Sequence, residues 1–223
     1  MLILHGINNH AGFGYVRSLT RECVRRGWIA VGFNFRGCGG VPLNTPRTYN
    51  GAYTGDIRGV VQTVSRRLQF HQQPLFLVGN SLGANLVAKY FGEEGKCGTL
   101  PPCVVGGWTL GNPMLIDSSN ASPFVSPLIA AGAKRGLLSV YKSMKDMRAM
   151  SPYFAKCMFK AWTAITLADY ERAMAPIYCR NDPEYPFGYK IGYDSAKAYW
   201  QDASSYRQTR FVSVPLLQLN FLG

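Results

Sequence analysis

Residues 75–85 read LFLVGNSLGAN, and this segment is the most informative one for the fold. Its first four residues are wholly apolar, which is typical of a buried strand, and residues 82–91 have the apolar spacing of a helix. Between the two, Gly79 and Gly83 flank Ser81 in the pattern G-x-S-x-G. Side chains at the two glycine positions would crowd a sharp turn, so the pattern predicts a tight strand-to-helix turn with the serine at its apex.

The predicted turn lifts the Ser81 hydroxyl clear of the sheet, at the N-terminus of the following helix. The positive end of a helix dipole favours negative charge that develops there. We therefore interpret Ser81 as a nucleophile on a nucleophile elbow. The alternative is a plain glycine turn, because the pattern recurs by chance in a chain with 24 glycines. The strand before it and the helix after it favour the elbow.

A second candidate element, His5-Gly6, ends the short apolar strand 2–4. In a fold with a nucleophile elbow, the loop at that place donates a backbone N–H to the oxyanion of acyl transfer. The predicted donors are the amides of Ile7 and Leu82, with His5 and Gly6 shaping the loop as Gly79 and Gly83 shape the elbow. The other two histidines, His10 and His71, are given the same structural interpretation.

The chain around the motif alternates strands and helices. Alternation of this kind predicts an α/β fold, with a mostly parallel sheet and helices on both of its faces. Apolar runs mark the strands and apolar residues at helical spacing mark the helices. The expected strands are 2–4, 28–35, 75–78, 103–110 and 211–219, and the expected helices are 15–26, 56–68, 82–91 and 194–203.

The pattern changes after Asn112-Pro113, where helical stretches rich in Met and aromatic residues continue without a strand signal. We expect 1–112 to form the N-terminal part of the core, 113–189 to be a helical cap insertion over the active site, and 190–223 to return to the core. The apolar cap residues would line an acyl pocket or contact lipid, although such stripes are more often plain core. They are Pro123, Phe124, Pro127, Tyr141, Met144, Met147, Met150, Tyr153 and Phe154.

The chain carries a net charge of +12, and 47% of its residues are hydrophobic. A basic excess suits nucleic acid or an anionic membrane surface. Lys and Arg occur here in ones and twos, without a block of five like charges, so we expect no nucleic-acid partner. The simplest interpretation is a solvated basic surface, and a peripheral membrane contact is the alternative.

The six cysteines form no CxxC pair, which argues against a zinc or redox motif. In a chain of this length we expect free thiols in a reducing compartment, and therefore a location inside the cell that the sequence does not specify further. No apolar run reaches the roughly eighteen residues of a membrane span. The cysteines are Cys23, Cys38, Cys97, Cys103, Cys157 and Cys179.

Beyond the elbow, four further segments fit one family together with it. The chain resembles the α/β-hydrolase fold serine hydrolases of the AB hydrolase family four group, which includes the α/β-hydrolase domain proteins one to three and the plant embryogenesis-associated hydrolases. The resemblance covers nearly the whole chain and is weak over 118–188. The segments are NFRGCGG at 34–40, PLNTPR at 42–47, GNSLGAN at 79–85, GEEG at 92–95 and YWQDASS at 199–205.

The resemblance implies a carboxylesterase or lipase that works through a Ser81 acyl-enzyme. The implied substrates are small-molecule or lipid esters such as acylglycerols and phospholipids, and the implied chemistry needs no metal and no organic cofactor. Members often carry an N-terminal membrane anchor, which we do not find before strand 2–4.

The chain departs from the family pattern at Asn80, where an aromatic residue is usual, and at both ends. The strands that precede 2–4 in the family are missing, and 214–220 resembles the strand that leads to the triad Asp. Triad order in this fold is Ser, acid, His. All three histidines precede Ser81, so we expect a partial fold that lacks its first and last strands and the triad Asp and His.

Our hypothesis from the sequence is therefore a fragment of an active hydrolase that is nearly inactive by itself. The alternative is a catalytically inactive binding protein with a hydrolase fold. The aspartates do not follow a strand at the place that the triad acid requires, so we interpret them as surface residues or helix caps. They are Asp56, Asp117, Asp182, Asp194 and Asp202.

Overall fold

The structure is a computed structural model, and it describes residues 1–45, 47–69, 72–147, 151–185 and 187–220. The chain forms two compact units, which are described separately below. The first unit contains residues 1–34, 54–115 and 204–223, and the second contains 35–53 and 116–203.

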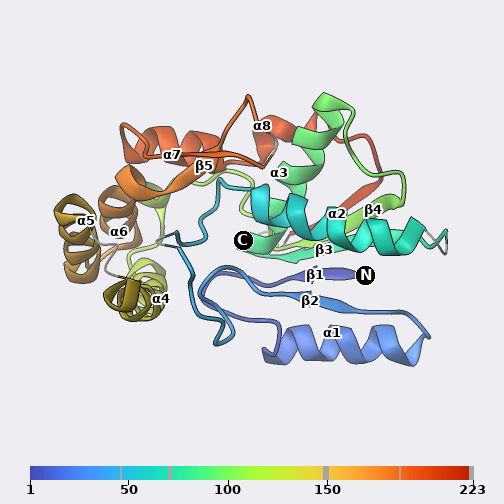
Figure 1. Ribbon diagram of the computed structural model, residues 1–223, viewed down its shortest axis with the longest axis horizontal. Helices are drawn as coiled ribbons and strands as arrows, with labels where there is room; N and C mark the ends of the chain where they lie inside the picture. Colours follow the sequence, from blue (N-terminus) through green and yellow to red (C-terminus); the bar gives the residue numbers. More distant parts are fainter. Residues whose placement is uncertain (46, 70–71, 148–150, 186, 221–223) are drawn as a thin grey trace. The chain divides into compact units, whose positions relative to one another are not determined.

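The first unit is built on a five-stranded sheet (Figure 1). The strands β1 (Leu2–Leu4), β2 (Val31–Phe33), β3 (Leu75–Asn80), β4 (Val104–Leu110) and β7 (Leu216–Leu219) lie in the order β2-β1-β3-β4-β7. Every neighbouring pair is parallel, which confirms the predicted fold class. The three residues of β1 are wholly buried, because this strand lies inside the sheet and both of its faces are covered.

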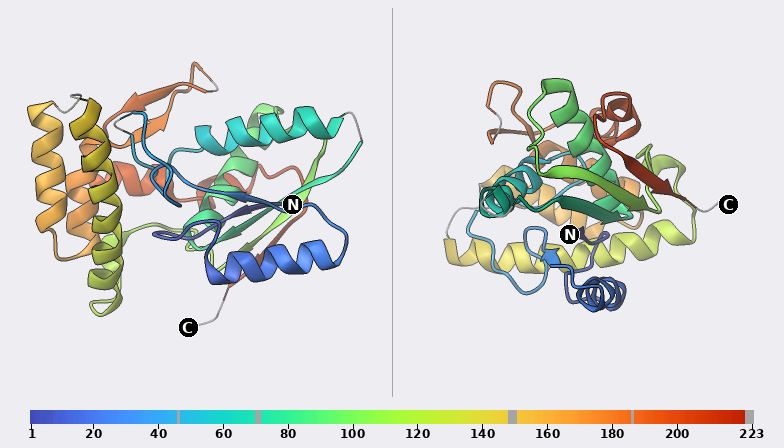
Figure 2. Two further views of the ribbon diagram at one scale, coloured as in Figure 1. Left: turned by 60° about the horizontal axis from the view of Figure 1, so that its bottom comes forward. Right: turned by 90° about the vertical axis from the view of Figure 1, so that its right-hand side faces the viewer.

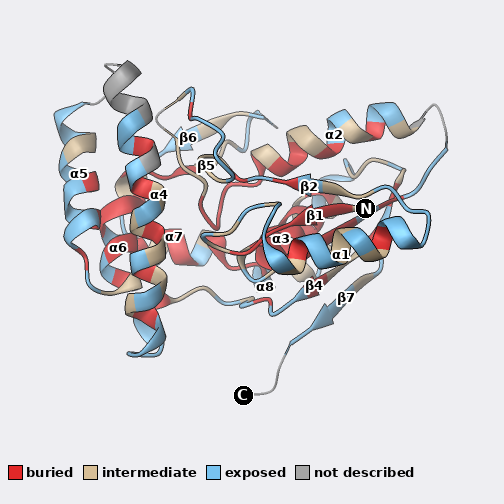
Figure 3. Cartoon of the chain, turned by 90° about the horizontal axis from the view of Figure 1, so that it is seen from below, coloured by how far each residue is buried: buried red, intermediate tan, exposed pale blue. Residues whose placement is uncertain are grey.

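Four helices belong to this unit: α1 (Gly14–Arg25), α2 (Gly55–Gln69), α3 (Leu82–Cys97) and the short α8 (Tyr206–Thr209). Helix α1 covers one face of the sheet, and α2 and α3 lie on the other (Figures 1 and 2). Helix α3 is the most buried of them, as its colour in Figure 3 shows. Its Gly92 and Gly95 let the backbone of residues 208–211 approach so closely that a β-carbon at either position would collide with it.

Three elements differ by more than two residues from the limits that the sequence predicts. The strands β2 and β7 are shorter than 28–35 and 211–219, and Trp28 and Ile29, which precede β2, are exposed. Helix α3 continues to Cys97 instead of ending at residue 91, and Gly98 then ends it in the left-handed conformation.

Buried charges explain the extra length of α3. Arg58 of α2 donates from Nε to Glu94 Oε1 at 2.6 Å, and its Nη2 lies 3.2 Å from Glu93 Oε2. Lys89, which is almost fully buried, reaches Glu93 Oε1 at 3.0 Å. Two cations and two anions therefore compensate each other between α2 and α3, so the last turns of α3 hold their charges without exposing them.

The second unit is mainly helical. Its helices are α4 (Val125–Met147), α5 (Pro152–Thr163), α6 (Leu167–Met174) and α7 (Ala196–Ala203), with the 3-10 turns η1 (Ser118–Asn120) and η2 (Ala175–Ile177). Tyr178, Tyr193, Tyr199 and Trp200 are buried in its core, where Tyr199 lies against the rings of the other two tyrosines.

This unit also contains an antiparallel strand pair, β5 (Cys179–Asn181) and β6 (Tyr189–Ile191). Residues 113–189, in which we expect helices and no strand signal, therefore also contain β5 and the first residue of β6. Each strand has three residues, and β5 has only one apolar residue, Cys179. A segment so short and so polar shows no strand periodicity, and its pairing comes from the local turn between the strands.

The limits of the two units differ from the expected ranges at three places. Residues 35–53 and 190–203 belong to the second unit, and residues 113–115 belong to the first. The Gly51 amide donates to Tyr199 Oη at 3.1 Å, and Asn50 Nδ2 donates to the Cys179 carbonyl at 2.9 Å. These buried bonds tie the segment after β2 to the distant helix α7 and strand β5.

The described cysteines are all free, as predicted. Within the residues that the structure describes, no helix is long and apolar enough to cross a membrane.

A buried acid in the second unit gives a testable pH dependence. Glu171 of α6 is buried and accepts a hydrogen bond from Trp200 Nε1. Burial raises the pKa of Glu171 from 4.5 to about 7. The folded state therefore binds more protons than the unfolded state between these two pKa values, and its stability falls as the pH rises through this window.

We expect the stability of the wild type relative to Glu171→Gln to fall by about 3 kcal/mol between pH 4.5 and pH 8, since one pKa unit is worth about 1.4 kcal/mol. Chemical denaturation at both pH values measures the difference. A constant difference between the two proteins would show that Glu171 does not titrate in this range.

Candidate active site

Ser81 is the single residue that connects β3, which ends at Asn80, to α3, which begins at Leu82. Its backbone has φ +52° and ψ −115°, a conformation that L-residues rarely adopt. Its side chain is exposed. The chain therefore makes a sharp, strained turn that presents the Ser81 hydroxyl to solvent at the N-terminus of a long helix.

The two flanking glycines are needed for steric reasons. A β-carbon at Gly79 would collide with the backbone of Gly83, since the turn folds these positions onto each other. A β-carbon at Gly83 would collide with the carbonyl of His5. Close approach, and not backbone flexibility alone, therefore explains why both positions of the motif carry glycine.

The loop after β1 lies next to this turn. Leu4 is paired with Gly79 in the parallel register, so β1 and β3 end side by side. A β-carbon added to Gly6 would lie 3.3 Å from Ser81 Cβ, which places the His5-Gly6 loop against the serine. The strand order also changes direction between β1 and β3, and ligands of open α/β sheets bind at the carboxyl ends of strands at such a switch point.

His5 is buried, and its Nδ1 donates to the Gly6 carbonyl at 2.7 Å. Desolvation lowers the pKa of His5, so the neutral ring is favoured. The ring thus bonds to the turn after β1, and its role in shaping this loop stays a prediction. His10 is exposed and accepts a hydrogen bond from the Gly12 amide at 3.1 Å. His71 lies outside the described residues.

Tyr15 is a site residue that sequence reasoning missed. Its hydroxyl, from the first turn of α1, accepts a hydrogen bond from the Gly6 amide at 2.7 Å. The bond occupies the Gly6 N–H and fixes the loop beside Ser81. A tyrosine near a helix N-terminus carries no signal of such a contact, which depends on where α1 packs.

A second polar group missed by sequence reasoning lies at the ends of β4 and β7. The Asn112 amide donates to Asn220 Oδ1 at 2.8 Å, and Asn220 Nδ2 donates back to the Asn112 carbonyl at 3.1 Å. Asn112 Nδ2 also reaches Gln218 Oε1 at 3.1 Å. The carboxyl ends of these two strands are thereby held together on the edge of the sheet that carries Ser81.

The aspartates do not occupy the position of a triad acid. None directly follows a strand of the five-stranded sheet. Asp117 caps η1 through the Ser119 amide, and Asp182 accepts from the Glu184 amide. Asp202 accepts from Tyr193 Oη at 2.6 Å, which is a contact within the second unit rather than a surface position. Asp56 lies in the first turn of α2, and Asp194 is exposed.

Among the residues that the structure describes, no three His, Cys, Asp or Glu side chains gather closely enough to hold a metal ion.

Comparison with known proteins places this geometry in a family. Residues 1–153 match the family model described as serine aminopeptidase, S33. The chain belongs to this family of α/β-hydrolases. The match includes β1, the His5-Gly6 loop and the whole elbow around Ser81.

Relatives of this S33 chain include an embryogenesis-associated protein, as expected from the sequence, and a yeast lipase. A monoacylglycerol lipase of Saccharomyces cerevisiae is 27% identical over 99% of the chain and 46% of its own length. The embryogenesis-associated protein EMB8 of Picea glauca is 36% identical over 44% of the chain and 21% of its own length. The chain thus spans about half the length, or less, of the curated relatives that it matches.

The fold also agrees with a solved α/β-hydrolase. The crystal structure of a monoacylglycerol lipase from Paleococcus ferrophilus aligns with 97% of the chain and 70% of its own chain, at a TM-score of 0.50 and 16% identity. At this identity the likeness supports the fold alone.

Proposed function

We propose that this chain carries the nucleophile of a serine carboxylic ester hydrolase, with Ser81 as the nucleophile and acylglycerol-type lipid esters as substrates. The observation that carries the proposal is the strained, exposed Ser81 at the N-terminus of α3, beside the loop after β1. Lipid esters are favoured as substrates because a yeast relative that aligns with 99% of the chain bears the name monoacylglycerol lipase.

The proposed reaction is acyl transfer to water. Ser81 Oγ bonds to the ester carbonyl carbon as its proton passes to a base, and the C–O bond to the alcohol then breaks as the alcohol takes up that proton. Water next attacks the acyl-enzyme, which releases the carboxylic acid and restores the Ser81 hydroxyl.

The oxyanion donors in this proposal are the amides of Leu82 and Ile7. Leu82 is the first residue of α3, so its N–H has no intrahelical acceptor. The Gly6 amide is already bonded to Tyr15, which leaves the next amide of the loop, that of Ile7, for the substrate. Two such donors, fixed before the reaction, stabilise the negative charge as it develops on the carbonyl oxygen.

The acid and base of the triad are assigned to the whole protein. In this fold they follow the serine in the sequence, and all three histidines of the 223 residues precede Ser81.

We also propose a peripheral membrane contact, since a lipid ester reaches an enzyme from a membrane or a micelle.

A fluorophosphonate probe tests the nucleophile. We expect the native protein, captured from its own cells, to be labelled within minutes, because only an activated serine attacks the phosphorus. Digestion with trypsin should place the label on peptide 68–89, in which Ser81 is the only serine. Heat-denatured protein is the control. A folded protein that stays unlabelled would instead support the inactive binding protein.

A further inference from the structure

Half of the net positive charge of the chain belongs to residues 125–163. Residues 125–163, from the start of α4 to the end of α5, contain seven Lys and Arg and one Asp, a net charge of +6 out of +12. The two helices lie side by side in the second unit (Figures 2 and 3). This density contrasts with the scattered Lys and Arg elsewhere in the chain.

On α4, the exposed side carries both apolar and basic side chains. Leu128, Arg135, Leu138 and Lys142 are all exposed and recur at intervals of three, four or seven residues, which places them on one side of the helix. Leu128 leaves 73% of its surface in contact with solvent. The opposite side, with Ala130, Ala133 and Leu137, is buried.

Helix α5 repeats this composition. Tyr153, Lys156, Phe159 and Lys160 are exposed, while Cys157, Met158 and Ala161 are buried on the other side. Phe159 is 69% exposed, and the twelve residues of α5 include no acid. Exposed aromatic residues that alternate with lysines, and no acid between them, differ from an ordinary solvated helix surface.

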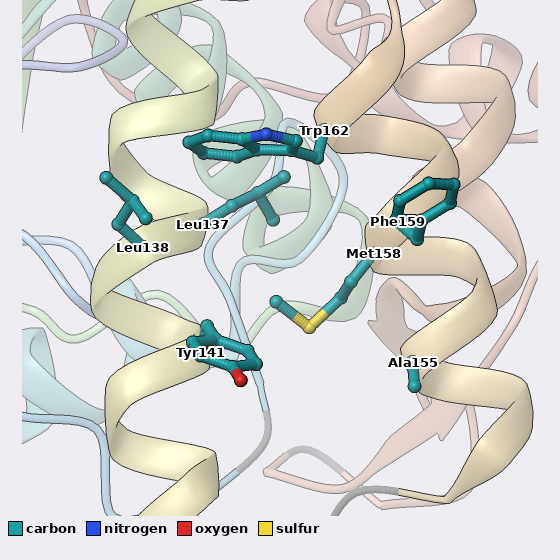
Figure 4. A pocket seen from close by; sticks show the side chains of 7 residues that line it. All are labelled: Leu137, Leu138, Tyr141, Ala155, Met158, Phe159 and Trp162. Carbon is teal, nitrogen blue, oxygen red and sulfur yellow. The ribbon is translucent and has the colours of Figure 1, made fainter.

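An apolar cavity of about 430 Å³ lies between α4 and α5 (Figure 4), and both buried and exposed side chains of the two helices line it. Leu138 and Tyr141 line it from α4, and Phe159 and Trp162 line it from α5. All seven lining side chains are aliphatic or aromatic. Their only heteroatoms are the Tyr141 hydroxyl oxygen, the Trp162 indole nitrogen and the Met158 sulfur. Continuous apolar surface of this kind is costly to leave in water.

We propose that this α4–α5 face, defined by the exposed side chains of the two helices, docks the protein on an anionic lipid bilayer. Its lysines and arginine would meet the charged headgroups, while Phe159 and Trp162 enter the boundary between headgroups and acyl chains. Charge complementarity selects an anionic bilayer over a neutral one. The inference deepens the proposed membrane contact, and it needs no catalysis by Ser81.

Vesicle sedimentation tests the role of charge. The purified full-length protein should bind vesicles of phosphatidylcholine with 30% phosphatidylserine and should bind pure phosphatidylcholine vesicles weakly. Lys156→Glu with Lys160→Glu should weaken binding to the anionic vesicles by at least about 30-fold. Each Lys near the bilayer surface raises the affinity for anionic vesicles about fivefold. The matched control is Arg66→Glu with Arg67→Glu, an exposed pair on α2 that changes the net charge equally.

Tryptophan fluorescence tests the insertion. The emission should shift to the blue when anionic vesicles are added, and Trp162→Phe should remove most of this shift. Trp28→Phe should retain it, since Trp28 is similarly exposed but lies in the first unit.

Equal binding to neutral and anionic vesicles, or equal weakening by the α2 control pair, would overturn the proposal. No binding at all would also overturn it and would leave the face for a protein partner. The outcome is separable from the proposed function, because Lys156→Glu with Lys160→Glu should leave the hydrolysis of a soluble short-chain ester unchanged, and Ser81→Ala should leave vesicle binding unchanged.

Discussion

Replacing Ser81 with alanine is expected to lower kcat for ester hydrolysis by about 10⁵-fold or more in the full-length protein, as the loss of a serine nucleophile does in other serine hydrolases. Oγ is the atom that forms the acyl-enzyme bond, and no neighbouring hydroxyl occupies the same apex. A soluble nitrophenyl ester and a monoacylglycerol, assayed side by side, measure the effect on both substrate classes.

The fold should tolerate this change. Alanine keeps the β-carbon, so the strain at φ +52° is the same before and after the substitution, and the Ser81 side chain is exposed. The thermal midpoint should therefore stay within a degree or two of the wild type. Ser18→Ala, at an exposed position on α1, is the matched control and should keep full activity. A Ser81→Ala protein that retains a tenth of the activity would rule out Ser81 as the nucleophile.

The sheet could be predicted from the sequence because each of its strands is short, apolar and bounded by turn residues. The stretches at 2–4, 75–78 and 103–110 all became strands within two residues of the expected limits. Their short apolar runs, bounded by turn residues, indicate strands of a mostly parallel sheet. The elbow was predictable for a related reason: its glycines are imposed by local sterics, which a sequence motif records.

The parts that could not be predicted depend on contacts between distant residues. Tyr15 reaches the Gly6 amide across nine residues, and Asn112 reaches Asn220 across 108. Strands β5 and β6 are too short for any periodicity, and residues 35–53 join the second unit through buried hydrogen bonds to residues beyond 170. Such side-chain bonds leave no trace in composition or spacing, because many residues of the same type lack the contact.

The apolar residues of the expected cap differ in how far they are buried. Phe124 and Tyr153 are exposed, and Tyr141 lines the cavity between α4 and α5. Phe154 packs against the buried core of the second unit. The side chains of Met144 and Met147, and all of Met150, lie outside what the structure describes. Burial therefore places Phe154 with the core, while the lining of an acyl pocket or a contact with lipid by the other residues stays a prediction.

Glu94→Ala is expected to be the most destabilising change away from the active site, at about 3–5 kcal/mol. Glu94 accepts from Arg58 Nε at 2.6 Å and from Thr99 Oγ1 at 2.7 Å, and it is buried. Removing the carboxylate leaves the two buried cations, Arg58 and Lys89, with Glu93 as a single anion. An uncompensated buried charge costs several kcal/mol, which is a large share of the stability of a domain.

The exposed ion pair at Glu22 is the matched control, because it also joins one glutamate to two arginines, Arg25 and Arg26. Glu22→Ala also removes a carboxylate that contacts two arginines, but at a solvent-exposed site. Water replaces these contacts there, and alanine has a high helix propensity. Urea denaturation should therefore show a large shift in midpoint for Glu94→Ala and a small one for Glu22→Ala. Equal shifts would mean that burial does not set the strength of these pairs.

A double variant separates the charge effect from packing. Arg58→Met with Glu94→Leu removes both partners of the buried pair and replaces them with apolar side chains of similar length, which leaves Lys89 paired with Glu93. Apolar replacements of buried ion pairs are often neutral or stabilising. The double variant should therefore be more stable than Glu94→Ala by about 2 kcal/mol or more. If it is as unstable as the single variant, the loss comes from packing between α2 and α3 and not from an unpaired charge.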